Sequence, residues 1–196
     1  MFPSTHDITP EHLDLAIDYL KRLLNNGNKV LIVSKPSYLC IKQICDMFGD
    51  YKKSILFRFT IGSNCSRILR FWEPNAPDYK ERKEALIYAF EAGYKTSLSC
   101  EPMLDNRIDE VIKDLSQYVT DAIWLGKMNF AIRRLKTNGY LDAENQAAAE
   151  QLLAWQNDES IIRLYNRYNN NPKIKWKESI KKVVGLEVST IKGEDK

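Results

Sequence analysis

Charged and hydroxyl side chains lie at or near the ends of short apolar runs. Lys35 follows VLIVS, Arg58 and Thr60 lie in LFRFT, and Glu101 follows KTSLSC. In parallel α/β folds the carboxyl ends of the strands carry the chemistry, so we expect these four residues at one rim of a sheet. A lysine and an arginine that converge there bind a carboxylate or a phosphate through charge-assisted hydrogen bonds. For each residue alone, the alternative is an ordinary solvated strand end.

Arg58 differs from the other three because it lies inside an apolar strand pattern. An arginine that is buried without a partner costs free energy, so the sequence predicts an acidic neighbour for it. Glu73 and Glu101 are the two candidates for that neighbour.

The cysteines and histidines do not have the spacing of a metal site. No CxxC is present, and the four cysteines are scattered over Cys40, Cys45, Cys65 and Cys100. We therefore expect no zinc site and a packing role for the thiols. His6 and His12 lie six residues apart without an obvious third ligand, so packing or loop hydrogen bonding is the simplest role for His6. The absence of GxGxxG, GxxxxGK(S/T), HExxH and GxSxG disfavours Rossmann, P-loop, zincin and hydrolase functions.

The elements that would position these residues alternate between helices and strands. Apolar residues at spacings of three and four predict helices, and short β-branched runs closed by Gly or Pro predict buried strands. The expected helices cover 10–26, 37–49, 77–92, 105–118, 142–156 and 158–169, and the expected strands cover 29–36, 54–63, 95–102 and 121–129. This order predicts a parallel sheet, with too few strands for a closed eight-stranded barrel. The fold class is therefore α/β: a partial (β/α) barrel of parallel strands over 1–130 with a helical C-terminal extension over 131–196.

Composition and charge exclude several classes of protein. The 196 residues are 44% hydrophobic and 28% charged, which is enough for a core and unlike a disordered chain. No run approaches the roughly 20 apolar residues of a membrane span, and the N-terminus lacks a secretory signal pattern. We therefore expect a cytoplasmic protein with reduced thiols and no membrane partner.

One segment carries an excess of positive charge. Residues 161–183 contain seven basic residues and one acidic residue, a net charge of +6 in a chain of +3. Tyr165, Tyr168 and Trp176 are interleaved with these cations and could stack on bases. The alternative function is thus a non-catalytic nucleic-acid or protein-binding module, against the simpler interpretation of a solvated helix and tail.

Several blocks of the sequence resemble one known family. The blocks THDITP, GNKVLIVSKP, LFRFTIGS, FWEPNAPDYKERKEALIYAFEAGYKTSLSCEPML and AIWLGKMN are similar to radical S-adenosylmethionine proteins grouped with spore photoproduct lyase, often labelled DNA repair photolyases. The resemblance covers roughly residues 1–130. It implies a partial (β/α)6 barrel that holds a [4Fe–4S] cluster and S-adenosylmethionine at the carboxyl ends of the strands.

The resemblance also implies roles for individual residues. Lys35, in VSKP, matches the lysine that meets the methionine carboxylate. Thr60, in FRFT, matches a serine that hydrogen-bonds the cofactor, and His6 stands where the lyase has a cofactor-contacting serine in a TSDI-like block. Glu73 and Glu101 belong to blocks typical of this subgroup, and we expect Glu101, with Arg58, to line the same rim.

The chain departs from the family at the cluster site. The family holds its cluster on three cysteines in a CxxxCxxC loop after the first strand, and this sequence has no such loop. Three thiolates are needed to hold the cluster with its fourth iron free. The resemblance therefore implies an N-terminally truncated radical S-adenosylmethionine enzyme that lacks its first strand and is inactive as written, with S-adenosylmethionine as ligand and no cluster in this chain alone. The missing unit would leave a sheet edge that could pair with a separate N-terminal segment or a second copy. A phosphate-binding α/β enzyme is a third alternative, but it needs a glycine-rich loop that is not evident.

Overall fold

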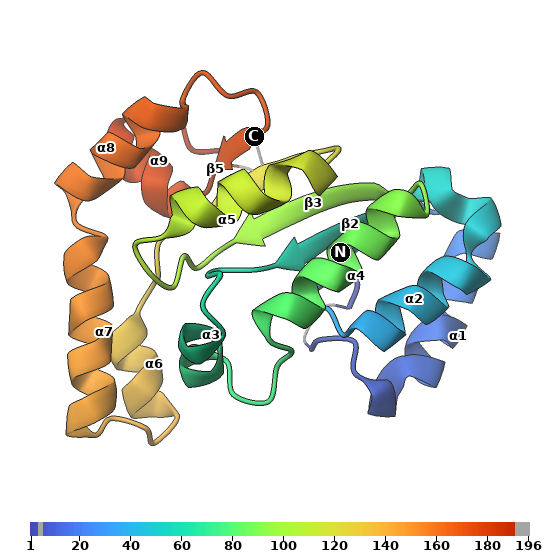
Figure 1. Cartoon of the computed structure of the whole chain (residues 1–196), viewed down its shortest axis with the longest axis horizontal. Coiled ribbons are helices and arrows are strands. Elements are labelled where there is room, and N and C mark those ends of the chain that lie inside the picture. Colours follow the sequence, from blue (N-terminus) through green and yellow to red (C-terminus); the bar gives the residue numbers. More distant parts are fainter. Residues whose placement is uncertain (4–5, 191–196) are drawn as a thin grey trace.

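Five parallel strands form the centre of the molecule (Figure 1). The structure is a computed structural model, and it describes residues 1–3 and 6–190. The strands lie in the sheet in the order of the chain: β1 (Val30–Ser34), β2 (Ile55–Thr60), β3 (Lys95–Cys100), β4 (Ile123–Leu125) and β5 (Ile174–Trp176). Every neighbouring pair is parallel, so the carboxyl ends of all five strands meet at one edge of the sheet.

Helices precede β1, connect the strands and follow β5. Their bounds are α1 (Leu13–Asn25), α2 (Tyr38–Met47), α3 (Ser66–Trp72), α4 (Tyr79–Glu91), α5 (Ile108–Leu115), α6 (Ala131–Thr137), α7 (Ala143–Trp155), α8 (Asp158–Tyr168) and α9 (Glu178–Val184). Helix α4 shows how local chemistry sets such bounds. The Asp78 side chain accepts a hydrogen bond from the Glu81 N–H at the start, and Gly93 adopts a positive φ of 82° just after the end.

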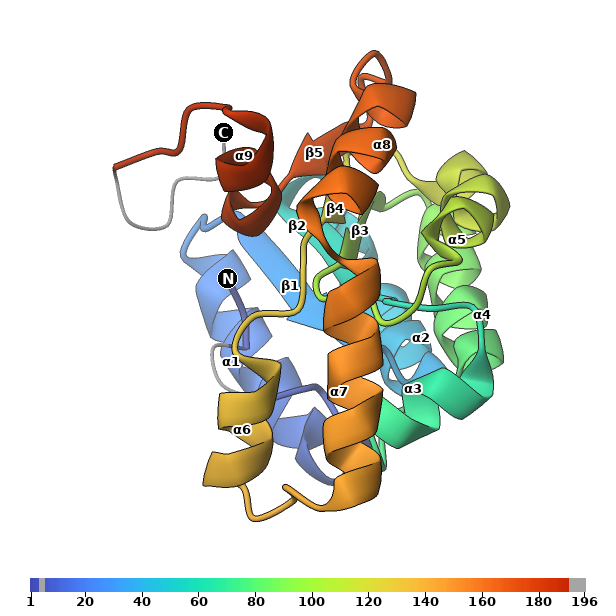
Figure 2. The ribbon, with the colours of Figure 1, turned by 90° about the vertical axis from the view of Figure 1, so that its left-hand side faces the viewer.

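The two faces of the sheet differ in exposure. On one face Ile32, Phe57, Phe59 and Leu98 are completely buried, and α2, α4 and α5 lie together on one side of the sheet (Figure 2). On the other face β1 and β2 present half-buried side chains, among them Arg58. This alternation follows from the two-residue period of a strand. Helices over one face and a less covered second face are consistent with a partial α/β barrel.

The sequence analysis located the first four strands and missed the fifth. The strands expected over 29–36, 54–63, 95–102 and 121–129 are confirmed as β1 to β4. The expectation of four strands is wrong, because β5 adds to the edge of β4 with Ile123 opposite Ile174. The sheet therefore extends beyond residue 130 into the segment expected to be a helical extension with a basic tail. The short helices α3, α6 and α9 were likewise not expected.

The N-terminal segment reaches the outer edge of β1. The Phe2 N–H donates to the Leu31 carbonyl (2.8 Å), and the Val33 N–H donates to the Phe2 carbonyl (2.9 Å), so Phe2 forms a parallel bridge beside Ile32. Asp7 and Ile8 in turn lie at the carboxyl end of β1, beside the Ser34 hydroxyl. Within the part of the chain that the structure describes, no helix is long and apolar enough to cross a membrane.

Candidate functional site

A cleft of about 1320 Å³ opens at the carboxyl ends of the strands. Lys35 after β1, Thr60 at the end of β2 and Glu101 after β3 all line it. The 73–78 loop and the antiparallel helices α6 and α7 form its other walls. The structure thus brings together three of the five residues that the sequence singled out.

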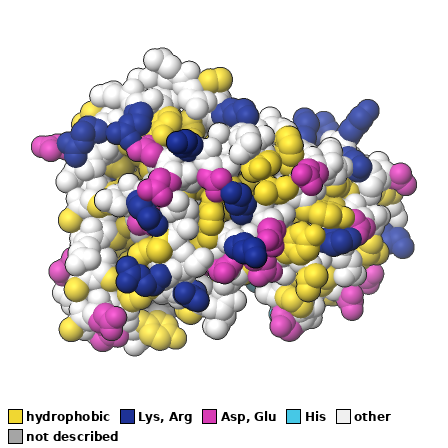
Figure 3. Space-filling view, in the orientation of Figure 1, with side chains coloured by type: hydrophobic (Ala, Val, Ile, Leu, Met, Phe, Trp, Pro, Cys, Tyr) yellow, Lys and Arg dark blue, Asp and Glu magenta, His cyan; other side chains and the backbone are white. Residues whose placement is uncertain are grey.

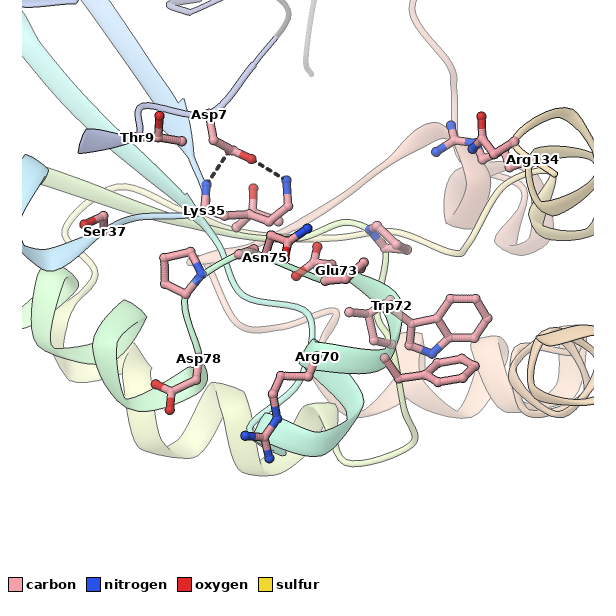
Figure 4. A pocket seen from close by; sticks show the side chains of 18 of the residues that line it. Asp7, Thr9, Lys35, Ser37, Arg70, Trp72, Glu73, Asn75, Asp78 and Arg134 are labelled. Atoms are coloured by element: carbon pink, nitrogen blue, oxygen red, sulfur yellow. Dashed lines mark hydrogen bonds and ion pairs between the residues drawn. The ribbon is translucent and has the colours of Figure 1, made fainter. Parts of the chain in front are cut away.

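Lys35 forms an ion pair with Asp7 inside this cleft (Figure 4). The Lys35 Nζ lies 2.7 Å from Asp7 Oδ2, and the Lys35 backbone N–H donates to Asp7 Oδ1, also at 2.7 Å. The Ser34 hydroxyl donates to the same Oδ1 at 3.3 Å. Burial opposes ionisation of Asp7, but the hydrogen bonds from Lys35 and Ser34 outweigh it and lower the pKa of this carboxyl. The Asp7 carboxyl is therefore ionised at neutral pH, and both residues of the pair line the cleft.

Asp7 was missed by the sequence analysis. It lies in the THDITP block next to His6, and no periodic pattern marks it. Asp7 and Ile8 lie beside Ser34, whose hydroxyl also accepts a hydrogen bond from the Ile8 N–H (3.1 Å). A pairing between residues 28 positions apart depends on that tertiary contact.

Arg82 of α4 is a buried arginine that holds together several residues of the cleft lining. Its side chain is completely buried, and its Nε donates to the Pro77 carbonyl (2.7 Å). Its Nη1 donates to the Thr60 carbonyl (3.0 Å) and to Glu73 Oε2 (2.6 Å). All three acceptors belong to residues that line the cleft. Arg82 therefore ties α4 to the end of β2 and to the 73–77 loop.

Glu101 is held from the C-terminal segment. Its Oε2 lies 3.4 Å from the Nζ of Lys177, the residue that follows β5. A Cβ at Gly126 would come within 2.9 Å of the Glu101 Cγ, so the glycine lets the two segments approach closely. The acidic partners expected for Arg58 thus pair elsewhere, Glu101 with Lys177 and Glu73 with Arg82.

Arg58 and His6 are not among the residues that line the cleft. The Arg58 side chain extends over the half-buried face of the sheet, where its guanidinium lies 4.8 Å from the ring centre of Trp124 and its Nε 3.4 Å from the Ser97 hydroxyl. Register explains this position, because Arg58 is paired with Val33 and Ser97, two residues before the end of β2. The His6 ring packs against His12, with centroids 5.8 Å apart.

The far end of the cleft carries aromatic and basic side chains. Phe71 and Trp72 of α3 pack edge to face, with ring centroids 5.0 Å apart, and Phe71 is 38% exposed. Arg70 lines the same end, and Figure 4 places Arg134 well away from the Asp7–Lys35 pair. Neither a helix nor a strand was expected between residues 63 and 77, so the side chains of α3 were not predicted to line a site.

The described residues do not fit a [4Fe–4S] cluster. Among them, no group of three or more His, Cys, Asp or Glu side chains is placed to hold a metal ion. Cys40, Cys45 and Cys100 are buried in the core, where burial raises the pKa of each thiol. Cys65 is half-buried, and a hydrogen bond from the Ile68 N–H lowers its pKa. Three thiolates on one face, which the cluster needs, are not present in this part of the chain.

The basic segment 161–183 is largely built into the fold. Trp176 is only 8% exposed and packs on Tyr165 with ring centroids 5.2 Å apart. The Tyr168 hydroxyl donates to Asp109 (2.7 Å), and Lys173 Nζ donates to the carbonyls of Ser116 and Val119. On the face drawn in Figure 3, basic and acidic side chains are interspersed. These contacts favour a structural role for the segment over base stacking.

The fold and the cleft define an α/β protein with a ligand-sized site at the carboxyl ends of parallel strands. Comparisons of the chain with protein-family models, with curated proteins and with solved structures found no match.

Proposed function

We propose that this chain is the S-adenosylmethionine-binding part of a radical S-adenosylmethionine-type protein of the DNA repair photolyase-like group, and that the cleft binds the cofactor. The observation that carries the proposal is Lys35, which lines the cleft at the carboxyl end of β1. It lies in the VSKP block, in which the resemblance assigns the lysine to the methionine carboxylate. Thr60 lines the same cleft and offers a hydroxyl to the ligand.

The size of the cleft also supports this proposal. Small-molecule sites usually enclose about 300–1000 Å³, and this cleft encloses about 1320 Å³. The excess volume leaves room for a second molecule beside the cofactor, as an enzyme that acts on a separate substrate requires. The aromatic and basic side chains at the far end form a different chemical surface from the Asp7–Lys35 end.

The proposed role of this chain is to bind the cofactor. In the family, a [4Fe–4S] cluster supplies the electron that cleaves the sulfonium bond. The described residues do not hold such a cluster. What they do in this proposal is bind and orient S-adenosylmethionine through Lys35 and Thr60.

Isothermal titration calorimetry with S-adenosylmethionine tests the proposal directly. Lys35→Met removes the charge-assisted contact and should weaken binding about tenfold or more. Thr60→Val removes one neutral hydrogen bond and should weaken binding by a smaller factor, about threefold to tenfold. Lys80→Met is the matched control, because Lys80 is 84% exposed and lies outside the cleft.

Two results would contradict this function. One is the absence of saturable binding by the wild-type chain at millimolar S-adenosylmethionine. The other is an unchanged affinity in Lys35→Met, which would place the ligand away from the carboxyl end of β1.

A further inference from the structure

Helix α1 carries two apolar faces. One face, which includes Leu13 and Leu20, is buried in the core. The other consists of Leu15, Tyr19 and Leu23, whose residues are 58%, 51% and 36% exposed. These three follow one another at a spacing of four, so they form one ridge along the helix, the outer ridge. With about 100° between successive residues, this ridge points about a third of a turn away from the buried face.

The position of α1 leaves the outer ridge accessible. The helix lies at the β1 edge of the molecule, where it packs against β1 (Figure 1, Figure 2). Single exposed apolar residues are ordinary on a protein surface, but a contiguous exposed group is typical of an interaction site. The partner that such a ridge fits is a second apolar helix face.

The charged residues along α1 change sign from one end to the other. They are Glu11 just before the helix, Asp14 and Asp18 in its N-terminal half, and Lys21 and Arg22 in its C-terminal half. An antiparallel pair of these helices brings the acidic half of each beside the basic half of the other. A parallel pair would instead place like charges together, which is unfavourable.

Asp18 and Arg22 flank the outer ridge. They lie three residues after Leu15 and Tyr19, and residues at that spacing are neighbours on a helix surface. Both are exposed, and the Arg22 guanidinium lies over the Tyr19 ring, 5.9 Å from its centre. Neither forms an ion pair with another residue that the structure describes. Both charges are therefore available to a partner.

We infer that α1 is a dimerisation surface, on which the outer ridge packs antiparallel against the same ridge of a second copy of this chain, with Tyr19 at the two-fold axis. In such an isologous pair each contact between two different residues occurs twice. Tyr19 packs on its counterpart, and Leu15 packs on Leu23 of the second copy. A rise of about 1.5 Å per residue places Arg22 about 3 Å along the axis from Asp18 of the second copy, so two reciprocal ion pairs form.

The size of the outer ridge sets the expected affinity. Three partly exposed apolar side chains cover much less than the roughly 800 Å² that each partner buries in a standard interface. A Kd in the micromolar range is therefore expected. The exposed ion pairs add little affinity, but they favour the antiparallel register over the parallel one.

Sedimentation velocity of the full chain, at concentrations from micromolar to millimolar, tests the inference. The wild-type chain should pass from monomer to dimer over this range. Tyr19→Glu places two like charges at the two-fold axis and should raise the Kd of the dimer at least about tenfold. Leu39→Glu on α2 is the matched control, because Leu39 is 68% exposed and lies outside the outer ridge, so the Kd should stay unchanged. Circular dichroism of both variants checks that the fold is intact.

Charge reversal tests the antiparallel register. Asp18→Arg and Arg22→Asp should each raise the Kd about threefold to tenfold, because each places like charges together across the axis. The double variant restores opposite charges, so its Kd should return to within about twofold of the wild-type value.

Three results would overturn the inference. A wild-type chain that stays monomeric at millimolar concentration would leave the outer ridge to a different partner. Equal effects of Tyr19→Glu and Leu39→Glu would place any dimer contact elsewhere, and a double variant no tighter than the single variants would exclude the antiparallel register. These measurements contain no ligand, so they are independent of whether the cleft binds S-adenosylmethionine.

Discussion

Replacement of Arg82 by methionine should be among the most destabilising changes in this protein. The guanidinium is completely buried and makes three hydrogen bonds, to Pro77, Thr60 and Glu73. Methionine fills a similar volume but leaves the Glu73 carboxylate, only 11% exposed, without its counter-charge. Removal of one partner from a buried ion pair costs about 3–5 kcal/mol. This is a large share of the roughly 5–15 kcal/mol that stabilises a typical domain.

Urea denaturation followed by circular dichroism measures this loss as a lower transition midpoint at an unchanged slope. Glu73→Gln is the milder second variant, since its amide oxygen still accepts from Nη1, and it should cost about 1–3 kcal/mol. Lys80→Met on the same helix is the control. Its pair with Glu84 spans 3.9 Å with side chains 84% and 50% exposed, so the midpoint should not move. If Arg82→Met shifts the midpoint no more than Lys80→Met does, the buried Arg82–Glu73 pair does not stabilise the fold.

Two further predictions concern the thiols and the close approach between Gly62 and Pro102. With iodoacetamide at pH 8, Cys65 should be alkylated well before the other cysteines, because its pKa is lowered while burial raises the pKa of Cys45 to about 12. Peptide mass spectrometry measures the order of labelling, and labelling of Cys45 before Cys65 would contradict the burial of Cys45. Gly62→Ala should lower stability by about 1–3 kcal/mol, because its Cβ would lie 2.4 Å from the Pro102 carbonyl oxygen. Gly49→Ala is the control, since its nearest neighbour is 4.0 Å away, and equal denaturation midpoints for the two variants would show that the chain relaxes freely around Gly62.

The framework of the sheet was predictable because its signals are local. A short, largely uncharged run closed by proline or glycine marks each of the first four strands, and parallel pairing follows from the helices between them. The rim positions of Lys35, Thr60 and Glu101 followed from the same logic. The fifth strand was not predictable in this way, since β5 is only three residues long and its middle residue, Lys175, is exposed.

The partners of the charged residues could not be predicted, because they depend on tertiary contacts. Glu73 and Glu101 were the acids expected beside Arg58, but they pair with Arg82 and Lys177, and the Arg58 guanidinium lies over the Trp124 ring. Arg82 was not singled out from the sequence, yet it is a completely buried cation that pairs with Glu73. The spacing of apolar residues predicts which face of a helix is buried, but it does not predict which loop covers that face.

The basic segment 161–183 forms ion pairs with acidic residues from the rest of the chain. The segment 161–183 has a net charge of +6, and the rest of the chain has −3. Two ion pairs join the segment to the rest of the chain: Arg167 pairs with Asp109 of α5, and Lys177 pairs with Glu101 after β3. A pattern that resembles a nucleic-acid-binding tail in the sequence therefore helps to attach β5 and α8 to the sheet. Since Glu101 lines the cleft, its ion pair with Lys177 means that the C-terminal segment helps to position a residue of the site.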